Sequence, residues 1–378
     1  MTATRMRRIL SIQPVRDGGG SERALIRMIR QLVADGWECH VALPAPARLA
    51  DEYAAAGANL HIVGMARLTT SGGWGRWLLF ALRWPVSVIR LTWLARRVGA
   101  DVVHTNSLHS WYGWAAARLV RRPHVWHARE IVTQSALALR VERALARRFA
   151  TQVISVSEAI ARQLDPGNVV VITDEIDPDE FSPSRAGRWR GRVGLPEDAI
   201  VVGSAARIDV WKGFDVLLDS VPLIHATRPD VHLVVAGAPV GGKDEYAAGL
   251  AQRAASLERV HWLGHRDDIA DLLADLDVFV QVSTNPEPYG LVLIEALTSG
   301  VPVVAGAAGG PIEILAGQSS SVGRLVPAGD AEALAGAVLA LLPAVPSTPA
   351  SRRTRVPLRQ VHPGQWSVVF EAALSSLS

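Results

Sequence analysis

The sequence predicts an α/β protein with two doubly wound, Rossmann-like domains that face each other across a cleft. Short β-branched runs alternate with longer runs rich in Ala, Leu and Arg over most of the chain, and this alternation is typical of strands joined by crossover helices in a parallel sheet. The strand-like runs form two sets, each large enough for one doubly wound sheet. A stretch rich in Asp, Pro, Gly and Arg lies between the sets, which favours two domains joined by a linker.

The strands of the first domain are expected at 8–12, 39–43, 60–63, 101–105, 124–127, 152–156 and 169–172. The strands of the second domain are expected at 200–205, 232–236, 260–263, 278–281, 301–305 and 323–326. The boundaries that follow are a first domain at 1–173, a linker at 174–198, a second domain at 199–350 and a tail at 351–378. A short helix is expected in the tail, at 365–377.

The composition allows two large cores, because 49% of the 378 residues are hydrophobic. Lysine and arginine total 39 and aspartate and glutamate total 36, and a balance this close gives no argument for nucleic-acid binding. The single cysteine, Cys39, excludes a disulfide within the chain and a metal cluster of cysteines alone. The apolar run at 9–12 is too short for the core of a signal peptide, so a cytoplasmic protein is expected.

A cluster of glycines, Gly18 to Gly20, follows the first expected strand and precedes an amphipathic helical run. Glycines at such a turn let the backbone approach a ligand closely, although a tight strand-to-helix turn explains them equally well. The cluster does not match the G-x-G-x-x-G pattern, which argues against a dinucleotide-dependent oxidoreductase.

The segment 65–100 combines tryptophan with arginine and contains no carboxylate. Its apolar run at 77–95 has almost the length of a membrane span, but Arg83, Pro85 and Arg90 interrupt it. A span would bury two charges at about 2.5–3.5 kcal/mol each, so we expect no transmembrane helix. Two interpretations stay open: a basic helix that lies on an anionic membrane, or a helix pair with tryptophan in the core and arginine on the solvated face.

Polar residues gather at the ends of two expected strands of the first domain. His104 and Asn106 come at the end of the fourth strand, and His127 and Arg129 come at the end of the fifth. Residues beyond the carboxyl ends of parallel strands line the ligand crevice in open α/β sheets. We therefore expect these four side chains in the wall of the cleft, although a lone histidine is more often structural.

Two cations lie near the start of the second domain. Arg207 follows the strand at 200–205, and Lys212 comes five residues later, directly before a glycine and a new helical run. Arginine can donate to two phosphate oxygens and lysine supplies a compact point charge, so the pair suits a diphosphate. Solvated surface charge is the alternative. The placement, and the fact that lysine occurs only here and at Lys243, favour a site.

The stretch 285–300 places two carboxylates around a predicted helix start. Glu287 lies in a loop rich in Pro and Gly, and Glu295 lies in an apolar helical run expected at 291–298. The free N–H groups at the start of that helix favour an anion, and carboxylates accept hydrogen bonds from hydroxyls. A phosphate together with hydroxyls suggests a nucleotide sugar.

In the order and spacing of these motifs, the chain resembles the retaining glycosyltransferases of the GT-B fold, specifically glycosyltransferase family 4. The motifs that carry the resemblance are the Gly-Gly-Ser-Glu turn at 19–22, the pair Arg207 and Lys212, the E-x7-E element of Glu287 and Glu295, and the glycine loop at 309–313. The resemblance implies an acceptor-side first domain, a donor-binding second domain and a C-terminal helix that crosses back to the first domain.

The resemblance also implies roles for single residues. Arg207 and Lys212 would hold the donor diphosphate, Glu295 the ribose and Glu287 the sugar hydroxyls. Contacts from the backbone would come from Gly19 and Gly20 in the first domain and from Tyr289, Gly290 and Leu291 in the second. His127 would lie near the reacting carbon, which makes His127, Arg207, Lys212 and Glu287 the catalytic set. The acceptor-side candidates are His104, Asn106 and Arg129.

The expected function is transfer of a hexose-type sugar, with retention of configuration, from a UDP- or GDP-sugar to a saccharide or lipid-linked acceptor in cell-surface polysaccharide or glycolipid assembly. No cofactor and no metal are expected, because the Asp-x-Asp pattern of Asp177 to Asp179 lies in the linker. The alternatives are a soluble small-molecule acceptor and a nucleotide-sugar epimerase on the same fold. We expect a cytoplasmic protein at the inner face of the membrane, with contact through 65–100.

Overall fold

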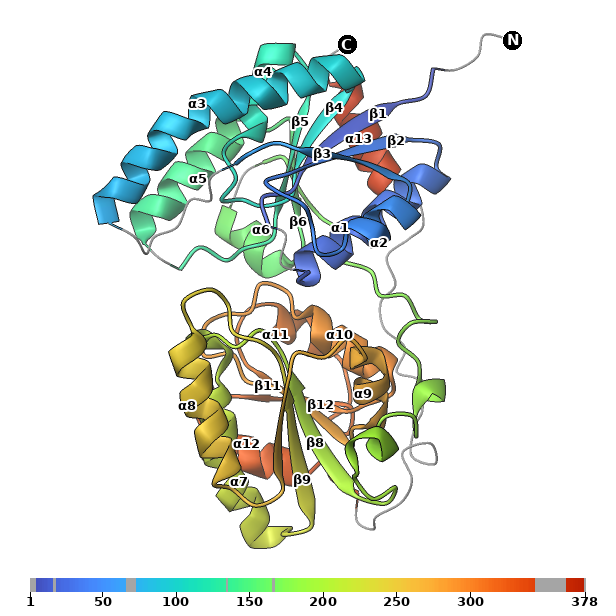
Figure 1. Ribbon diagram of the computed structural model, residues 1–378, viewed down its shortest axis with the longest axis vertical. Helices are drawn as coiled ribbons and strands as arrows, with labels where there is room; N and C mark the ends of the chain where they lie inside the picture. Colours follow the sequence, from blue (N-terminus) through green and yellow to red (C-terminus); the bar gives the residue numbers. More distant parts are fainter. Residues whose placement is uncertain are drawn as a thin grey trace. The chain divides into compact units, whose positions relative to one another are not determined.

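The computed structural model describes residues 5–15, 18–65, 73–133, 135–164, 167–343 and 365–376, without the side chains of 73–77. It divides the chain into unit 1, Met1–Glu175 with Gln360–Ser378, and unit 2, Ile176–Arg359. Each unit contains one parallel sheet with helices on both faces (Figure 1). The two-domain, Rossmann-like GT-B fold that the sequence predicted is confirmed.

The sheet of unit 1 has the strand order β3-β2-β1-β4-β5-β6-β7. Its strands are β1 (Arg8–Ile12), β2 (Glu38–Leu43), β3 (Ala58–Ile62), β4 (Val102–Thr105), β5 (His124–Ala128), β6 (Gln152–Ser155) and β7 (Val169–Val171). All neighbouring pairs are parallel. The direction of winding reverses between β1 and β4, and a doubly wound sheet opens its crevice at the carboxyl edge of such a reversal.

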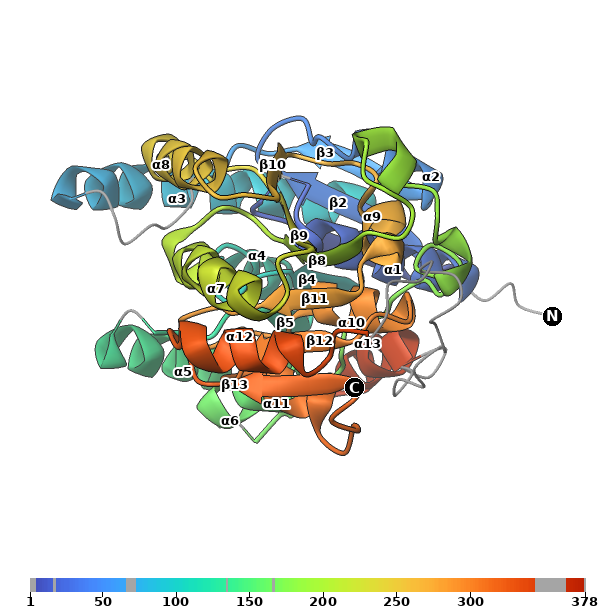
Figure 2. The same ribbon diagram turned by 90° about the horizontal axis from the view of Figure 1, so that it is seen from below.

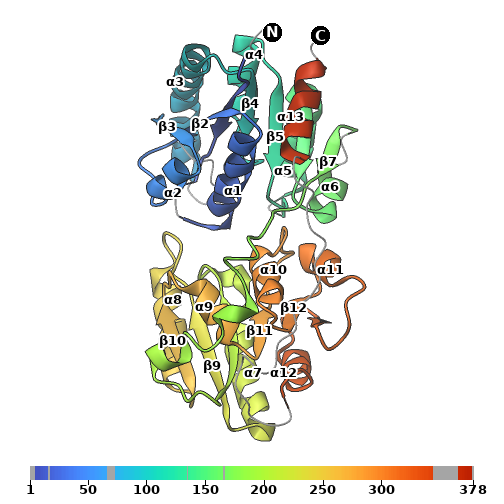
Figure 3. The same ribbon diagram turned by 90° about the vertical axis from the view of Figure 1, so that its right-hand side faces the viewer.

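Helices cover both faces of this sheet (Figure 3). α1 (Gly20–Ala34), α2 (Ala50–Ala55) and α13 (Gln365–Ser375) share one core, and α3 (Gly73–Val98) and α4 (Gly113–Val120) share the other. α5 (Ala136–Phe149) follows β5, and α6 (Glu158–Leu164) follows β6. The tail helix α13 places Trp366 and Phe370 in the core beside β4 and β5. The C-terminal helix therefore packs within unit 1.

The segment 65–100 forms one long helix, α3, in its described part, and residues 66–72 lie outside the described residues. Val88, Leu91 and Leu94 are buried on its inner side. Trp84 is partly buried against the same core, whereas Trp93 is 59% exposed. By length and composition alone, the part Leu78–Val98 could cross a membrane, but a third of that window is buried inside the protein. α3 is therefore a covering helix of unit 1 with an apolar outer side.

The sheet of unit 2 has the strand order β10-β9-β8-β11-β12-β13. Its strands are β8 (Ile200–Ala205), β9 (Val231–Ala236), β10 (Val260–Gly264), β11 (Val278–Gln281), β12 (Val303–Gly306) and β13 (Gly323–Val326). On one face lie α7 (Phe214–Thr227), α8 (Asp244–Ala255) and α12 (Ala331–Leu339), and on the other lie α9 (Ile269–Asp275), α10 (Leu291–Thr298) and α11 (Gly310–Leu315) (Figure 2). The winding reverses between β8 and β11.

The segment for which the sequence predicted a linker is largely packed into unit 2. It contains two short 3-10 helices, η1 (Pro183–Arg185) and η2 (Arg190–Val193). Trp189 and Arg190 are 0% and 1% exposed, and the Asp275 carboxylate accepts hydrogen bonds from both of their backbone N–H groups, at 2.7 and 2.9 Å. The polar composition that suggested a linker reflects instead a set of buried polar contacts with the end of α9.

Candidate functional site

The polar residues that the sequence singled out in unit 2 converge at the carboxyl edge of its sheet. Arg207 and Lys212 follow β8, Glu287 follows β11, and Gly309 follows β12. Lys212 is the last residue of the 3-10 helix η3 (Val210–Lys212). These loops flank the reversal of winding between β8 and β11, which is where open α/β sheets bind ligands.

The centre of this edge is an ion pair between Lys212 and Glu287. Lys212 Nζ lies 2.6 Å from Glu287 Oε2. The same oxygen accepts hydrogen bonds from Ser283 Oγ at 2.8 Å and Gln281 Nε2 at 3.1 Å. Three donors on one oxygen fix the carboxylate in a single orientation. The carboxylate in turn holds the Lys212 ammonium group at the sheet edge.

Lys212 is an unusually buried lysine. Its side chain is only 10% exposed, and Nζ lies 3.9 Å from the centroid of the Trp211 ring. Burial lowers the pKa of Lys212, and the neighbouring Glu287 opposes that shift. A desolvated cation interacts more strongly with an anion than one in bulk water, so Lys212 is suited to a phosphate ligand.

The loop that carries Glu287 is held by the glycine loop after β12. Gly310 N–H donates to the Glu287 carbonyl at 2.8 Å, and Glu287 N–H donates to the Ala308 carbonyl at 3.3 Å. Gly309 has a φ of 75°, and a Cβ there would lie 2.1 Å from the Glu287 carbonyl oxygen. A Cβ at Gly310 would likewise lie 2.1 Å from the Tyr289 carbonyl oxygen. Only glycine permits this approach of the two loops.

We expect Gly309→Ala to weaken donor binding by displacing the Glu287 loop, at a cost of about 1–3 kcal/mol in backbone strain. Gly317→Ala is the matched control, because Gly317 has the same φ of 75° but no heavy atom within 4 Å of its Cβ position. The KM for the donor and the free energy of unfolding should be measured for both variants. Equal effects of the two substitutions would show that left-handed strain, rather than contact with the Glu287 loop, sets the requirement.

The helix predicted at 291–298 is α10, with Gly290 as its N-cap at a φ of 100°. Tyr289 and Leu291 flank this glycine at the helix start, where the first N–H groups have no acceptor within the helix. Glu295 lies in the second turn and is 8% exposed. Arg207 is exposed in the loop after β8. The structure thus places every predicted unit 2 residue at or beside one edge of the sheet.

In unit 1 the glycine turn and Asn106 meet at the reversal between β1 and β4. Gly18 has a φ of 74°, and Gly19 is the N-cap of α1, which begins at Gly20. Asn106 Nδ2 donates to Gln13 Oε1 at 2.8 Å and to the Ser21 carbonyl at 3.1 Å. Asn106 therefore ties the end of β4 to the glycine turn at the carboxyl edge, and it is only 2% exposed.

His104 and His127 lie near the ends of β4 and β5, as expected, but both are buried and do not form the wall of a cleft. Both side chains point to the face covered by α13, where the ring centroids lie 5.6 Å from Phe370 for His104 and 5.5 Å from Trp366 for His127. They are 0% and 2% exposed. Burial lowers the pKa of His104 to about 3 and that of His127 well below its ordinary value, so both rings are neutral at pH 7.

Arg129 is also committed to contacts within unit 1. Its Nη1 lies 3.2 Å from His127 Nε2, and its Nη2 pairs with Asp174 Oδ2 at 2.5 Å. The Glu130 carboxylate accepts from Ser107 Oγ at 2.5 Å and joins the loops after β4 and β5. Arg129 was predicted as an acceptor-side residue in the wall of a cleft, but its side chain is 7% exposed.

Sequence reasoning missed Gln281 and Ser283, which hold the Glu287 carboxylate. One signal was available, because Gln281 is a polar residue at the end of an otherwise apolar strand, Val278–Gln281. It also missed Asp174, whose partner Arg129 lies 45 positions away in the sequence. No local pattern marks a contact over that separation.

Two family models match the chain. The model "Glycosyltransferase Family 4" matches residues 18–180, and the model "Glycosyl transferases group 1" matches residues 186–346. The first match lies in the N-terminal part of the chain and the second lies within unit 2. Between them they include the glycine turn, the Lys212 loop and the Glu287 loop.

Curated relatives share about a third of the aligned residues. D-inositol 3-phosphate glycosyltransferase of Stackebrandtia nassauensis is 32% identical over 56% of this chain and 53% of its own length, and the protein of that name from Mycolicibacterium paratuberculosis is 31% identical over 73% and 66%. The lipopolysaccharide core biosynthesis mannosyltransferase LpsB of Rhizobium meliloti is 31% identical over 50% and 55%. The chain spans about half to two thirds of the length of these relatives.

Solved structures match over almost the whole chain. Anabaena HepE in complex with UDP-glucose is 27% identical with a TM-score of 0.77, covering 98% of this chain and 99% of that chain. A glycosyltransferase from Rickettsia africae shares the fold at a TM-score of 0.72 and 17% identity, covering 99% and 95%. With its motifs in place and both parts of the chain matched by family models, the protein belongs to glycosyltransferase family 4.

Proposed function

We propose that this protein transfers a hexose-type sugar from a nucleoside diphosphate sugar to an acceptor hydroxyl. The observation that carries the proposal is the buried pair of Lys212 and Glu287 at the reversal of winding in unit 2. One member suits a diphosphate and the other suits sugar hydroxyls. The relatives add support, since HepE was solved with UDP-glucose and LpsB is named as a mannosyltransferase.

The Lys212–Glu287 contact implies an exchange of partners when the donor binds. Lys212 Nζ leaves Glu287 Oε2 for an oxygen of the donor diphosphate, and Arg207 and the start of α10 add positive potential there. Glu287, still held by Gln281 and Ser283, then accepts hydrogen bonds from sugar hydroxyls. Glu295 in α10 is assigned to the ribose hydroxyls, and the backbone at Tyr289 to Leu291 to the sugar or phosphate.

The proposed reaction retains the configuration at the anomeric carbon. The bond between that carbon and the diphosphate oxygen breaks, and the acceptor oxygen forms its bond on the same face. The acceptor proton passes to the departing diphosphate, so no carboxylate of the protein acts as nucleophile. The catalytic contribution of Lys212 and Arg207 is to stabilise the negative charge that develops on the leaving group. We propose that the reaction needs no divalent metal.

The proposed acceptor is a saccharide or a lipid-linked saccharide of cell-surface polysaccharide or glycolipid assembly, at the inner face of the membrane. This part draws on the basic, apolar segment 65–100, through which we propose peripheral membrane contact. Gly19 and Gly20 remain proposed donor contacts. His104, Asn106, His127 and Arg129 remain candidates, but their buried positions give no support to direct roles, so the proposal rests on unit 2. The alternatives are a soluble small-molecule acceptor and a nucleotide-sugar epimerase.

A donor-hydrolysis screen tests the proposal. The protein should release free sugar slowly from one UDP- or GDP-hexose in a panel that also contains dTDP-sugars, and the rate should be unchanged in EDTA. Added lipid extract should convert hydrolysis to transfer, detected as a glycolipid by mass spectrometry with the anomeric configuration read by NMR. Release of an epimerised nucleotide sugar without acceptor would favour the epimerase, and inhibition by EDTA would contradict metal independence.

A further inference from the structure

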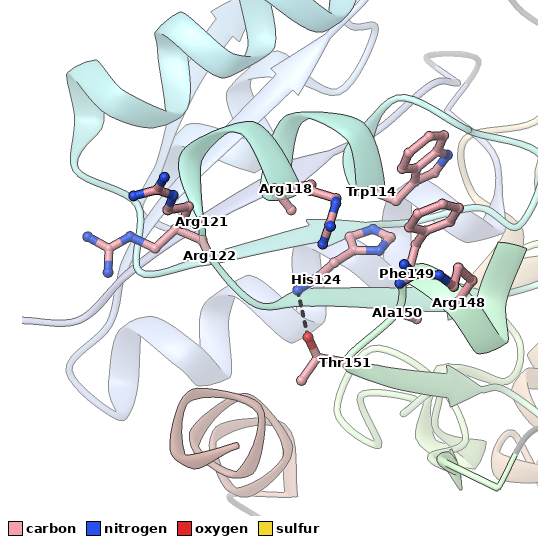
Figure 4. A pocket seen from close by; sticks show the side chains of 10 residues that line it. Trp114, Arg118, Arg121, Arg122, His124, Arg148, Phe149, Ala150 and Thr151 are labelled. Atoms are coloured by element: carbon pink, nitrogen blue, oxygen red, sulfur yellow. Dashed lines mark hydrogen bonds between the residues drawn. The ribbon is translucent and has the colours of Figure 1, made fainter. Parts of the chain in front are cut away.

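A pocket lies in unit 1 at the amino end of β5, on the edge of the sheet opposite to Asn106 and the glycine turn. Its volume is about 370 Å³, and four of its lining residues are arginines: Arg118, Arg121, Arg122 and Arg148. Figure 4 shows Arg118, Arg121 and Arg122 coming from the end of α4 and Arg148 from the end of α5. In this view the Arg121 and Arg122 side chains extend away from Arg118 and Arg148. We refer to the pocket that these four residues line as the arginine pocket.

No carboxylate among the residues that the structure describes forms an ion pair with the arginine pocket. Over 78–133 and 135–149 there are three carboxylates, Asp101, Glu130 and Glu142, and none of them is exposed. The same stretches contain ten exposed arginines: Arg83, Arg90, Arg96, Arg97, Arg118, Arg121, Arg122, Arg140, Arg147 and Arg148. This face of unit 1 therefore has a strong positive potential.

The dipoles of α4 and α5 neutralise only part of the positive charge of the arginine pocket. The ends of α4 and α5 at the pocket each contribute roughly half a negative elementary charge, which is about one unit against four guanidinium groups. Aromatic contacts hold the pocket wall, because the Trp114 and Phe149 rings stack at 4.2 Å between centroids and Arg148 lies over Phe149 at 5.4 Å. A preformed, uncompensated positive pocket suits a phosphate group.

An exposed apolar stripe on α3 adjoins the arginine pocket. Leu82, Ile89 and Trp93 are 65%, 64% and 59% exposed on the outer side of α3. α3 is joined to the pocket helix, because Arg96 Nη2 donates to the Leu119 carbonyl at 3.0 Å and the Trp84 ring lies 6.0 Å from the Trp114 ring. An apolar helix side framed by arginine matches a membrane interface with anionic headgroups.

We propose that the α3–α5 face of unit 1 docks on an anionic membrane and that the arginine pocket receives the phosphate of a phospholipid headgroup. The apolar stripe on α3 then enters the boundary between headgroups and acyl chains. This inference specifies the membrane contact within the proposed function, and it does not depend on the sugar-transfer chemistry, because vesicle binding needs neither donor nor acceptor.

Flotation with vesicles tests the docking. The full chain should bind phosphatidylglycerol vesicles and not phosphatidylcholine vesicles at low salt. Arg118→Gln/Arg122→Gln should weaken this binding about 30-fold, from two arginines near an anionic surface. The control Arg30→Gln/Arg188→Gln removes the same charge from exposed positions outside this face and should bind like wild type. Ile89→Gln/Trp93→Gln should also lose binding with the pocket intact.

Inorganic phosphate distinguishes a headgroup pocket from diffuse attraction. Phosphate should displace the wild type from the vesicles more effectively than chloride at equal ionic strength, and the Arg118→Gln/Arg122→Gln variant should lose that difference. Equal effects of phosphate and chloride on the wild type would overturn the pocket, and equal binding to both lipids would overturn the docking. Phosphate binding in solution without vesicle binding would assign the pocket to a free anion and also overturn the proposal. The rate of donor hydrolysis in vesicle-free buffer should be the same for the wild type and all variants. If none of them hydrolyses a donor, that result counts only against the proposed function.

Discussion

Replacing Lys212 with alanine is expected to lower turnover by about 100- to 1000-fold, the range for loss of one preorganised group that stabilises developing charge. Lys212 is held at the sheet edge by Glu287 at 2.6 Å and has little contact with water. A cation in that setting acts on the leaving diphosphate with weak screening. Measurement of kcat with saturating donor reports the loss, and circular dichroism with thermal unfolding reports whether unit 2 stays folded.

The chain offers a matched control, because its other lysine is Lys243. Lys243→Ala removes the same charge from the residue before α8 and should leave turnover unchanged. Lys212→Ala removes one of three donors to the Glu287 carboxylate, and Gln281 and Ser283 remain, which favours a folded variant. Turnover of Lys212→Ala within a few-fold of wild type would refute the role of Lys212 at the diphosphate.

The pH profile adds an independent readout on the same residue. Burial lowers the pKa of Lys212, so the ammonium group loses its proton at a lower pH than an ordinary lysine would, and activity should fall early on the alkaline side. Glu287 opposes this shift. The residual activity of Glu287→Gln should therefore fall at a still lower pH than that of the wild type.

The strands were predictable because buried parallel strands are continuous β-branched runs. The predicted strand at 200–205 has the bounds of β8, and that at 278–281 has the bounds of β11. The strand predicted at 301–305 begins at Val303, because Pro302 has no N–H to donate to a ladder and Val301 N–H closes the preceding turn to the Ala296 carbonyl. The start of this strand thus depends on single backbone N–H groups, which a pattern of hydrophobic residues does not reveal.

The site was predictable to the level of loops and not of contacts. Glycine clusters and charged residues after strands pointed to the carboxyl edge of the second sheet, where the structure brings Lys212 and Glu287 together, since strand ends share an edge wherever a sheet is parallel. The bond between Lys212 and Glu287 spans 75 positions, and only the strand order places β8 beside β11. For His104 and His127, the sequence could not show that α13, more than 200 residues later in the chain, covers that face of the sheet.

Arg190 is the residue for which the sequence and the structure predict opposite results. In a linker, Arg190→Ala would leave stability almost unchanged. In the structure, its guanidinium donates to the Asp275 carbonyl at 2.6 and 3.1 Å and to the Glu197 carbonyl at 2.9 Å. It also pairs with Asp277 Oδ2 at 3.0 Å, and both side chains are 2% exposed. Arg190 thus joins the segment after Ile176 to the end of α9 and the start of β11.

Arg190→Ala is therefore expected to lower the free energy of unfolding of unit 2 by about 3–5 kcal/mol, because it leaves the Asp277 carboxylate buried without its cation and several carbonyl groups without a donor. Arg192→Ala is the control two residues away. Its side chain is 54% exposed and its nearest carboxylate oxygen, on Asp271, lies at 3.1 Å, so its loss should cost about 1 kcal/mol or less. Urea unfolding followed by tryptophan fluorescence measures both variants. Equal, small losses in the free energy of unfolding would mean that the segment 176–198 adds no more stability than a linker. A much larger loss in Arg190→Ala than in Arg192→Ala would make this segment part of the folded core that supports the Lys212 and Glu287 loops.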